Sequence, residues 1–447
     1  MVVENQYPTR SETPSVFGCG YAALCTAAAP VVWRLSHLGT GNYQSHRLAL
    51  LREYVLHAVF GTTLGTIGIV ALFTGVARWT LSFGDAFELW AGATAISIAG
   101  RMVLRVALGQ IRRRGRNLRQ VLILGSNRRA EEFVAAAGRH PELGLRVVGF
   151  ADDPWVGAVA LCEKGVEKVA DLDSVESYLR ESVVDEVVVC LPLKSYYEYV
   201  SRIASYCETL GILLRLEGEL FSGRLAMASD VLSQRPLLQM GKGRIEGGAA
   251  VVKEVMDRSL ALVLLLLTAP VMLGAAIAVR LSSPGPILFR QRRLGLNKRP
   301  FSMLKFRTMV ADAEQRLAEL EHRNEVKGAA FKLAGDPRIT PVGRYLRKFS
   351  IDELPQLWNV LRGDMSLVGP RPLPLRDYNQ FSEDWHRRRL SVRPGLSCLW
   401  QVSGRHHLSF DRWMELDMRY IDHWSLWLDI KILAKTLVVV LRGEGAW

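Results

Sequence analysis

The sequence has little cysteine and lacks the motifs that several common classes of protein require. Its six cysteines are scattered over 447 residues and none forms a C-x-x-C pair, so a disulfide scaffold and a zinc ribbon are excluded. The first ten residues are polar, and a secretory signal peptide is not expected. No internal repeat and no low-complexity tract is present, which excludes repeat architectures and largely disordered chains.

Acidic residues are the minority, with 44 Asp and Glu against 57 Lys and Arg and a net charge of +13. This excess favours an anionic partner, such as nucleic acid, acidic lipid or a phosphorylated substrate. No nucleic-acid-binding motif is present, so we expect no nucleic acid partner. The pair His406-His407 lacks a third ligand at a suitable spacing, which indicates solvated surface rather than a metal site.

Apolar segments are concentrated near the start of the chain. Three segments lie at 13–33, 54–77 and 89–108, and the second is uncharged except for His57. Arginines flank the second span on its N-terminal side and the third on its C-terminal side, whereas the 78–88 loop between them carries Asp85 and Glu88. By the positive-inside rule, the second span runs outward and the third returns. We therefore predict about three spans within 1–110, although the first segment could also be a buried soluble helix.

A fourth apolar run, SLALVLLLLTAPVMLGAAIAV, covers 259–279. Basic residues flank it on both sides, so both ends favour the cytoplasmic face. Pro270 lies at its middle, where it removes a helix hydrogen bond and favours a kink. These features predict a re-entrant helix over 253–280 that enters and leaves the membrane by one face. A straight span is the alternative.

The middle of the chain, 119–235, alternates strand-like and helical segments. Strands are predicted at 119–124, 146–153, 184–192 and 212–220, as in a Rossmann-like parallel sheet. Gly125 is followed by Ser-Asn-Arg-Arg rather than a G-x-G-x-x-G spacing, and no Y-x-x-x-K pair occurs. We therefore favour a structural or regulatory domain over an NAD-dependent epimerase or dehydratase, and expect no NAD requirement. A glycine-rich linker is predicted at 236–250.

Two adjacent carboxylates, Asp352 and Glu353, precede Pro355 in the segment DELPQLWNVL. Proline fits the first turn of a helix, so both carboxylates are predicted at a helix N-terminus. The helix dipole and the many nearby arginines are predicted to lower their pKa values. An ionised Asp suits attack on a phosphoryl group, and a neighbouring Glu suits Mg²⁺. A capped helix with surface ion pairs is the alternative.

Long motifs of the C-terminal half resemble the bacterial sugar transferases, the polyprenyl-phosphate hexose-1-phosphate transferases. These motifs are SPGPILFRQRRLG, KFRTM, DELPQLWNVLRGDMSLVGPRP and RPGLSCLWQVSGR. The preceding part resembles the large form of that family, which usually has four N-terminal spans rather than three. The resemblance implies an α/β membrane protein in four parts: N-terminal transmembrane helices (1–110), a Rossmann-like cytosolic domain (119–235), a linker (236–250) and a mainly helical catalytic domain (251–447).

The resemblance also implies roles for individual residues. Asp352 would attack the sugar nucleotide and form a sugar-phosphoryl enzyme, and Glu353 would bind Mg²⁺. The implied substrate- or phosphate-binding residues are Lys305, Arg307, Arg347, Arg371, Gln401 and Arg405. Lys253, Asp257 and Pro270 would belong to the re-entrant helix. The sequence departs from the usual Ser-Pro at the helix break, having Ala269 before Pro270.

The implied reaction transfers hexose-1-phosphate from a UDP-hexose to polyprenyl (undecaprenyl) phosphate, with glucose or galactose as the first expectation. It would initiate exopolysaccharide, capsule or O-antigen synthesis at the bacterial inner membrane, with the catalytic domain in the cytoplasm. The lipid bilayer is an expected partner and a homodimer is a candidate. A non-catalytic scaffold of polysaccharide assembly is the rival interpretation. Near the C-terminus, aromatic residues alternate with basic ones, which predicts helices in the lipid headgroup layer or ordinary packing. These aromatic residues are Trp413, Tyr420, Trp424 and Trp427.

Overall fold

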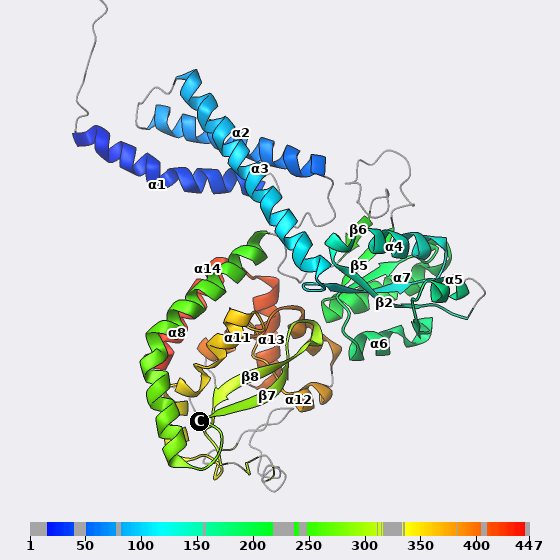
Figure 1. Cartoon of the computed structure of the whole chain (residues 1–447), viewed down its shortest axis with the longest axis vertical. Coiled ribbons are helices and arrows are strands. Elements are labelled where there is room, and N and C mark those ends of the chain that lie inside the picture. The colour runs from blue at the N-terminus through cyan, green and yellow to red at the C-terminus, as the bar shows by residue number, and fades with distance from the viewer. Residues whose placement is uncertain are drawn as a thin grey trace, which may run out of the picture. The chain divides into compact units, whose positions relative to one another are not determined.

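The computed structural model contains two compact units, Met1–Arg116 and Asn117–Trp447 (Figure 1). The residues described are 16–39, 51–76, 82–154, 158–217, 237–240, 248–310, 312–313, 315, 333, 336–381, 383–403 and 409–442. In the first unit, α1 (Val16–Gly39) packs on α2 (Leu51–Gly75), and α2 packs on α3 (Phe83–Arg113). The hydroxyls of Thr62 and Thr94 lie 2.8 Å apart and join α2 to α3. Interhelical hydrogen bonds of this kind hold apolar helices together.

Among the described residues, three helices are long and apolar enough to cross a membrane. They are Val55–Gly75, Phe83–Arg113 and Ala249–Ser282. The first two coincide with the second and third predicted spans. Helix α1 coincides with the first predicted segment but is not one of the three. Parts of the predicted N-terminal topology, including most of the 34–53 loop, lie outside the described residues.

The second unit begins with an α/β layer whose parallel sheet confirms the sequence prediction. Its strands are β1 (Arg119–Leu124), β2 (Leu145–Ala151), β3 (Lys168–Ala170), β4 (Glu186–Val189), β5 (Leu213–Glu217) and β6 (Leu237–Met240). Their order is β3-β2-β1-β4-β5-β6, with the first five parallel and β6 antiparallel to β5. Strand β6 falls inside the predicted linker, so the sheet extends beyond the expected boundary at 235.

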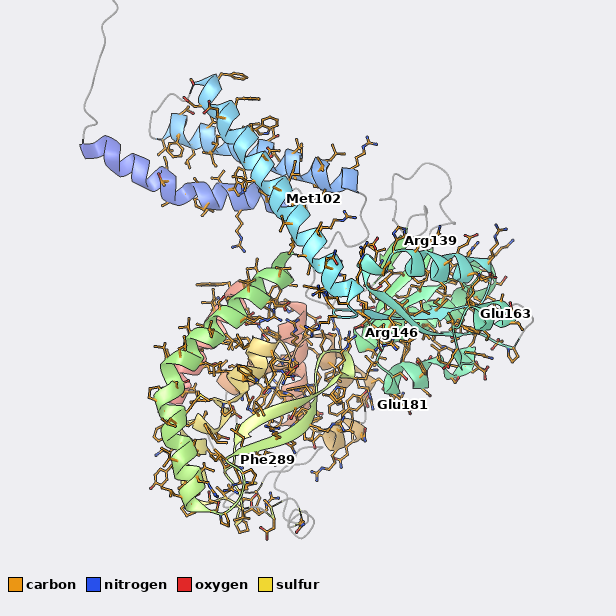
Figure 2. The ribbon with its side chains drawn as sticks, viewed as in Figure 1. Met102, Arg139, Arg146, Glu163, Glu181 and Phe289 are labelled. Atoms are coloured by element: carbon orange, nitrogen blue, oxygen red, sulfur yellow. The ribbon has the colours of Figure 1, made fainter. Side chains whose placement is uncertain are left out.

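Helices cover both faces of this sheet (Figure 1). They are α4 (Arg128–Arg139), α5 (Ala158–Glu163), α6 (Val175–Glu181) and α7 (Leu193–Leu210), with short 3-10 turns η1 (Pro141–Leu143) and η2 (Leu172–Ser174). Leu179 and Ile203 on α6 and α7 pack against Leu122 and Val187 of the sheet. The charged residues Arg139 and Glu163 lie at the surface of this layer (Figure 2). We call residues 117–240 the Rossmann-like part.

The rest of the second unit, from 248 onward, is mainly helical. Its helices are α8 (Gly248–Ser282), α10 (Pro341–Lys348), α11 (Gln356–Arg362), α12 (Leu375–Asn379), α13 (Phe410–Asp422) and α14 (Leu426–Arg442). Its strands are β7 (Leu288–Leu294) and β8 (Pro300–Phe306), which form a hairpin, and β9 (Ser366–Val368) and β10 (Gly395–Ser397), which pair in parallel. Its 3-10 turns are η4 (Leu296–Lys298), η6 (Ile351–Glu353), η7 (Asp384–Ser391) and η8 (Trp400–Val402). Following the prediction from the sequence, we call this the catalytic part.

Helix α8 is one continuous helix that follows the edge of the catalytic part (Figure 1). Its first half packs through Ala261 into a core that contains Leu357 and Tyr420. Its second half packs through Ala275 and Val279 against Phe306 and Leu346. The opposite face is apolar and exposed, and includes Leu262, Val263, Leu266, Leu267, Val271 and Leu273. Both halves of the helix therefore contact one and the same folded part.

Candidate active site

The carboxylate pair lies where the sequence places it, directly before a helix. Asp352 and Glu353 form the 3-10 turn η6, and α11 begins at Gln356 immediately after Pro355. Ser350 has a left-handed backbone (φ 54°) and reverses the chain between α10 and η6. This reversal, unusual for a residue other than glycine, places the basic face of α10 beside the carboxylates.

Glu353 is held by two cations on a single oxygen. Its Oε1 accepts a hydrogen bond from Lys305 Nζ at 2.8 Å and another from Arg371 Nη2 at 2.7 Å. Lys305 comes from β8, and Arg371 follows β9. Burial by itself raises the pKa of Glu353, but the charges of Arg371 and Lys305 outweigh it and hold the pKa well below its ordinary value. Glu353 is therefore ionised.

Asp352 differs from its neighbour. It is only 7% exposed, and no hydrogen bond to its carboxylate is found among the described residues. Burial, aided by the negative charge of Glu353, raises the pKa of Asp352 to about 6 against the opposing charges of Lys305, Arg347 and Arg371. The predicted lowering of this pKa was wrong, because desolvation exceeds the effect of the cations. Above pH 6 the carboxylate is mostly ionised and has no hydrogen-bond partner among the residues that the structure describes.

Arg347 supplies a third cation from α10. Its Nε donates to Thr308 Oγ1 at 3.0 Å, and its charge acts on Asp352. Burial lowers the pKa of Arg347. Thr340 caps the helix by accepting from Gly343 N at 3.0 Å. A Cβ on Gly343 would lie 2.1 Å from the carbonyl oxygen of Thr308, so only glycine permits α10 to approach this close.

Arg307 and Gln401, two other predicted binding residues, are not brought into the ion pairs of Glu353. Arg307 donates from Nη1 to the carbonyl of Pro284 at 2.6 Å and from Nη2 to that of Ser283 at 2.7 Å. It therefore closes the turn that follows α8. Gln401 is buried in η8. Arg405 lies outside the described residues.

The residues predicted for the re-entrant helix form a buried polar network. Lys253 Nζ contacts Asp429 Oδ2 at 2.6 Å, and Asp429 Oδ1 accepts from the Tyr420 hydroxyl at 2.8 Å. Asp257 Oδ2 accepts from Ser366 Oγ at 2.6 Å. These bonds join α8 to β9, α13 and α14. Asp429 was not identified from the sequence, because it lies 176 positions from Lys253.

Sequence reasoning also missed three residues that support the cations. Asn359 on α11 accepts from Leu304 N at 3.0 Å and donates to the Ser302 carbonyl at 2.8 Å, which fixes β8. Arg389 Nη2 donates to the Arg371 carbonyl at 2.7 Å, and Arg293 Nη1 donates to that of Pro372 at 3.2 Å. Asn359 and Arg293 lie inside the quoted motifs, but nothing in their spacing reveals these contacts.

The aromatic residues near the C-terminus mostly pack inside the protein. Tyr420 is 2% exposed, which favours packing, the second of the two alternatives, for this residue. Trp413 stacks on Trp400 with ring centroids 4.6 Å apart, and Trp424 Nε1 donates to Asp429 at 3.1 Å. Trp427 is 62% exposed. Ordinary packing therefore explains three of the four.

The arrangement combines a buried carboxylate, a second carboxylate neutralised by two cations, and a third cation facing the first carboxylate. Such a site can bind phosphate oxygens through Arg and Lys and offers a carboxylate as nucleophile. No group of three or more His, Cys, Asp or Glu side chains suited to a metal ion occurs within the described part of the chain. Fold and site together define an α/β protein with membrane-type helices and a pair of carboxylates surrounded by cations.

Comparisons with known proteins agree with this class. The bacterial sugar transferase family matches residues 248–443, and a CoA-binding domain family matches residues 39–216. The chain is 31% identical over 441 residues to a UDP-glucose:undecaprenyl-phosphate glucose-1-phosphate transferase of Xanthomonas campestris pv. campestris, covering 96% of this chain and 86% of the relative. The chain belongs to the bacterial sugar transferase family.

Two further relatives differ in how much of this chain they match. A UDP-galactose-lipid carrier transferase of Erwinia amylovora is 32% identical over 407 residues, which cover 88% of this chain and 82% of the relative. An uncharacterized sugar transferase, EpsL, of Bacillus subtilis (strain 168) is 42% identical over 195 residues, which cover 44% of this chain but 90% of the relative. That relative therefore has little room for a counterpart of the first 250 residues.

Proposed function

We propose that this protein transfers hexose-1-phosphate from a UDP-hexose to polyprenyl (undecaprenyl) phosphate, the step that initiates an exopolysaccharide, capsule or O-antigen. The observation that carries the proposal is the contrast between two adjacent carboxylates. Glu353 is ion-paired twice, whereas Asp352 is buried, unbonded within the described residues and surrounded by cations. The names of the relatives support the donor and the acceptor, with glucose or galactose as the hexose.

The reaction proceeds in two displacements at phosphorus. The Asp352 carboxylate attacks the β-phosphorus of the UDP-hexose, the bond from that phosphorus to the bridging oxygen breaks, and UMP leaves. Hexose-1-phosphate is then held on Asp352 as an acyl phosphate. An oxygen of polyprenyl phosphate attacks the same phosphorus, which releases polyprenyl-diphosphate-hexose and regenerates the carboxylate.

The cations stabilise charge on the diphosphate. Arg347 uses Nε for Thr308, and no hydrogen bond from its terminal nitrogens is found among the described residues, so they remain for phosphate oxygens. Lys305 and Arg371 are held on Glu353 and are already oriented before substrate binds. Donors fixed in this way lose little entropy on binding, which is how proteins accelerate phosphoryl transfer.

Mg²⁺ fits the same pair of carboxylates as a cofactor. The ion pairs of Glu353 both use Oε1, which leaves Oε2, together with Asp352, for a hard cation. Mg²⁺ is commonly bound by one or two carboxylates plus substrate phosphates. Bound there, it would offset the negative charge of the diphosphate.

The packing of α8 supports the re-entrant topology, with the catalytic part on the cytoplasmic side of the inner membrane. Ala261 near one end and Val279 near the other both pack on the part that carries the carboxylates. A straight span would carry its second half across the bilayer, away from Phe306 and Leu346. The exposed apolar face, which includes Leu266 and Leu267, would then meet lipid.

Topology can be tested with single cysteines in a background that lacks the native cysteines. Ser259→Cys and Ser283→Cys are expected to resist an impermeant thiol reagent in intact cells and to react in inverted vesicles. Ser82→Cys, in the segment predicted to lie outside, is the control and should react in intact cells. Labelling of Ser283→Cys from outside would establish a straight span and exclude the re-entrant helix.

The function is tested with membranes that contain the protein, supplied with a panel of UDP-sugars labelled at the sugar or at the β-phosphate. Both labels are expected in the lipid product, since sugar and phosphate move together. The rate should fall as pH decreases through about 6, because the protonated Asp352 is not a nucleophile. Incorporation of the sugar label without the phosphate label would contradict the proposed chemistry, and absence of transfer from every UDP-sugar would favour the scaffold interpretation.

A further inference from the structure

One carboxylate of the Rossmann-like part binds the hairpin of the catalytic part. Asp185, directly before β4, is 2% exposed and accepts from Gln120 N at 2.7 Å. It also accepts from Arg299 Nη1 at 3.1 Å and from the Asn297 side-chain amide. The second terminal nitrogen of Arg299 reaches the other carboxylate oxygen. Arg299 and Asn297 belong to the turn between β7 and β8, so a fork of two donors joins the two parts.

The turn is shaped by this contact. Asn297 (φ 50°) and Lys298 (φ 63°) are consecutive residues in the left-handed region, which a lysine adopts only where its surroundings hold it. Lys298 Nζ donates to the carbonyls of Leu179 and Arg180 in the last turn of α6. A cation at a helix C-terminus is favourable. The turn is thus fitted to one carboxylate and one helix end.

The hairpin connects this turn to the active site. Strands β7 and β8 pair without a bulge from Leu294 and Pro300 at the turn to Leu288 and Phe306 at the other end, and Lys305 lies on β8. Next to the turn, Leu294 N donates to the Leu373 carbonyl at 3.4 Å, and Arg293 donates to that of Pro372. The hairpin therefore carries Lys305 and also holds the segment that follows Arg371.

A second contact reaches Arg371 by a separate path. Arg180 Nη2 and the Tyr206 hydroxyl, both from the Rossmann-like part, donate to Asp384 Oδ2 at 2.8 and 3.2 Å. Asp384 begins η7, the same turn that contains Arg389, whose Nη2 donates to the Arg371 carbonyl at 2.7 Å. The hairpin thus connects to both cations that hold Glu353, and the second path connects to Arg371.

We propose that Asp185 is a positioning residue for the transferase site, acting through the β7–β8 hairpin on Lys305 and Arg371; this proposal rests on the proposed function. It gives the Rossmann-like part a mechanical role. The contact between Asp185 and the hairpin lies at the amino ends of the parallel strands. Sheets of this kind bind nucleotides at the opposite edge, where the strands have their carboxyl ends. At that opposite edge the Asn127 side chain already caps α4, and Asp152 already accepts from Ser126.

The test compares Asp185→Asn with Asp173→Asn in the full-length protein. Asparagine keeps an acceptor for Gln120 N but removes the charge that binds Arg299. We expect kcat to fall about tenfold, with a smaller change in KM for the UDP-sugar. Asp173 is exposed in the same part of the chain, and its variant should match wild type.

A double variant separates positioning from general stability. Adding Arg299→Gln to Asp185→Asn should cause little further loss of activity, because both changes remove the same interaction. If Asp185→Asn strongly lowers the thermal midpoint, Arg299→Lys is the variant to measure instead. Lysine keeps the positive charge but cannot bind both oxygens of Asp185. We expect a severalfold lower kcat for Arg299→Lys. Wild-type kcat in the folded variants, or a change confined to KM, would overturn the proposal. Transfer by wild type and Asp173→Asn supports the proposed function whatever Asp185→Asn does, so the two proposals can fail separately.

Discussion

Asp352→Asn is expected to lower transfer by more than about a thousandfold, since removal of a covalent nucleophile has effects of this order or larger. The amide has the shape of the carboxylate but cannot form the acyl phosphate. Release of UMP and formation of the lipid product should both stop, because the first displacement is blocked. Asp411→Asn changes an exposed carboxylate of the catalytic part and should retain most of the activity.

The loss should not come from unfolding. The pKa of Asp352 is higher in the folded protein than the ordinary value of 3.8, so ionisation of this group reduces the free energy of unfolding as pH rises from about 4 to about 6. A neutral asparagine avoids that effect at pH 7. The thermal midpoint of the variant should therefore equal or exceed that of wild type, and a folded variant with full transfer activity would exclude Asp352 as the nucleophile.

Local sequence patterns were sufficient for much of the architecture. Alternating strand and helix signals predicted the parallel sheet, because buried strands and amphipathic helices leave distinct periodicities. Pro355 predicted the start of α11 and hence the place of Asp352 and Glu353, because proline has few acceptable positions in a helix. The end of the sheet was missed, since β6 is a four-residue strand whose pairing with β5 depends on tertiary contact.

The properties that depend on burial and on distant contacts could not be obtained in this way. The many arginines around Asp352 suggested a lowered pKa, but the sequence does not reveal that the group is 7% exposed, and burial reverses the sign. Arg307 was grouped with the phosphate-binding residues because of its motif, yet its side chain binds two carbonyls. The partner of Lys253, Asp429, is remote in the chain, and charge alone does not select one carboxylate among 44 acidic residues.

Glu353→Gln is expected to be nearly as damaging for activity as Asp352→Asn, but for a different reason. Glutamine removes the charge that pairs with both Lys305 and Arg371, so two partly buried cations lose their common counterion. Breaking a partly buried ion pair from one side is costly, on the order of 1–3 kcal/mol in the free energy of unfolding. We expect a lower thermal midpoint, a rate reduced by about a hundredfold and a weaker dependence on Mg²⁺.

The pH profile of the residual activity distinguishes this role from simple destabilisation. The negative charge of Glu353 raises the pKa of Asp352, so its removal should move the acidic limb to lower pH. Glu415→Gln, which alters an exposed pair with Arg412, is the matched control and should change neither quantity. An unchanged Mg²⁺ titration in folded Glu353→Gln would place the metal elsewhere. An unchanged rate would mean that Lys305 and Arg371 do not need Glu353 to hold them in their active orientation.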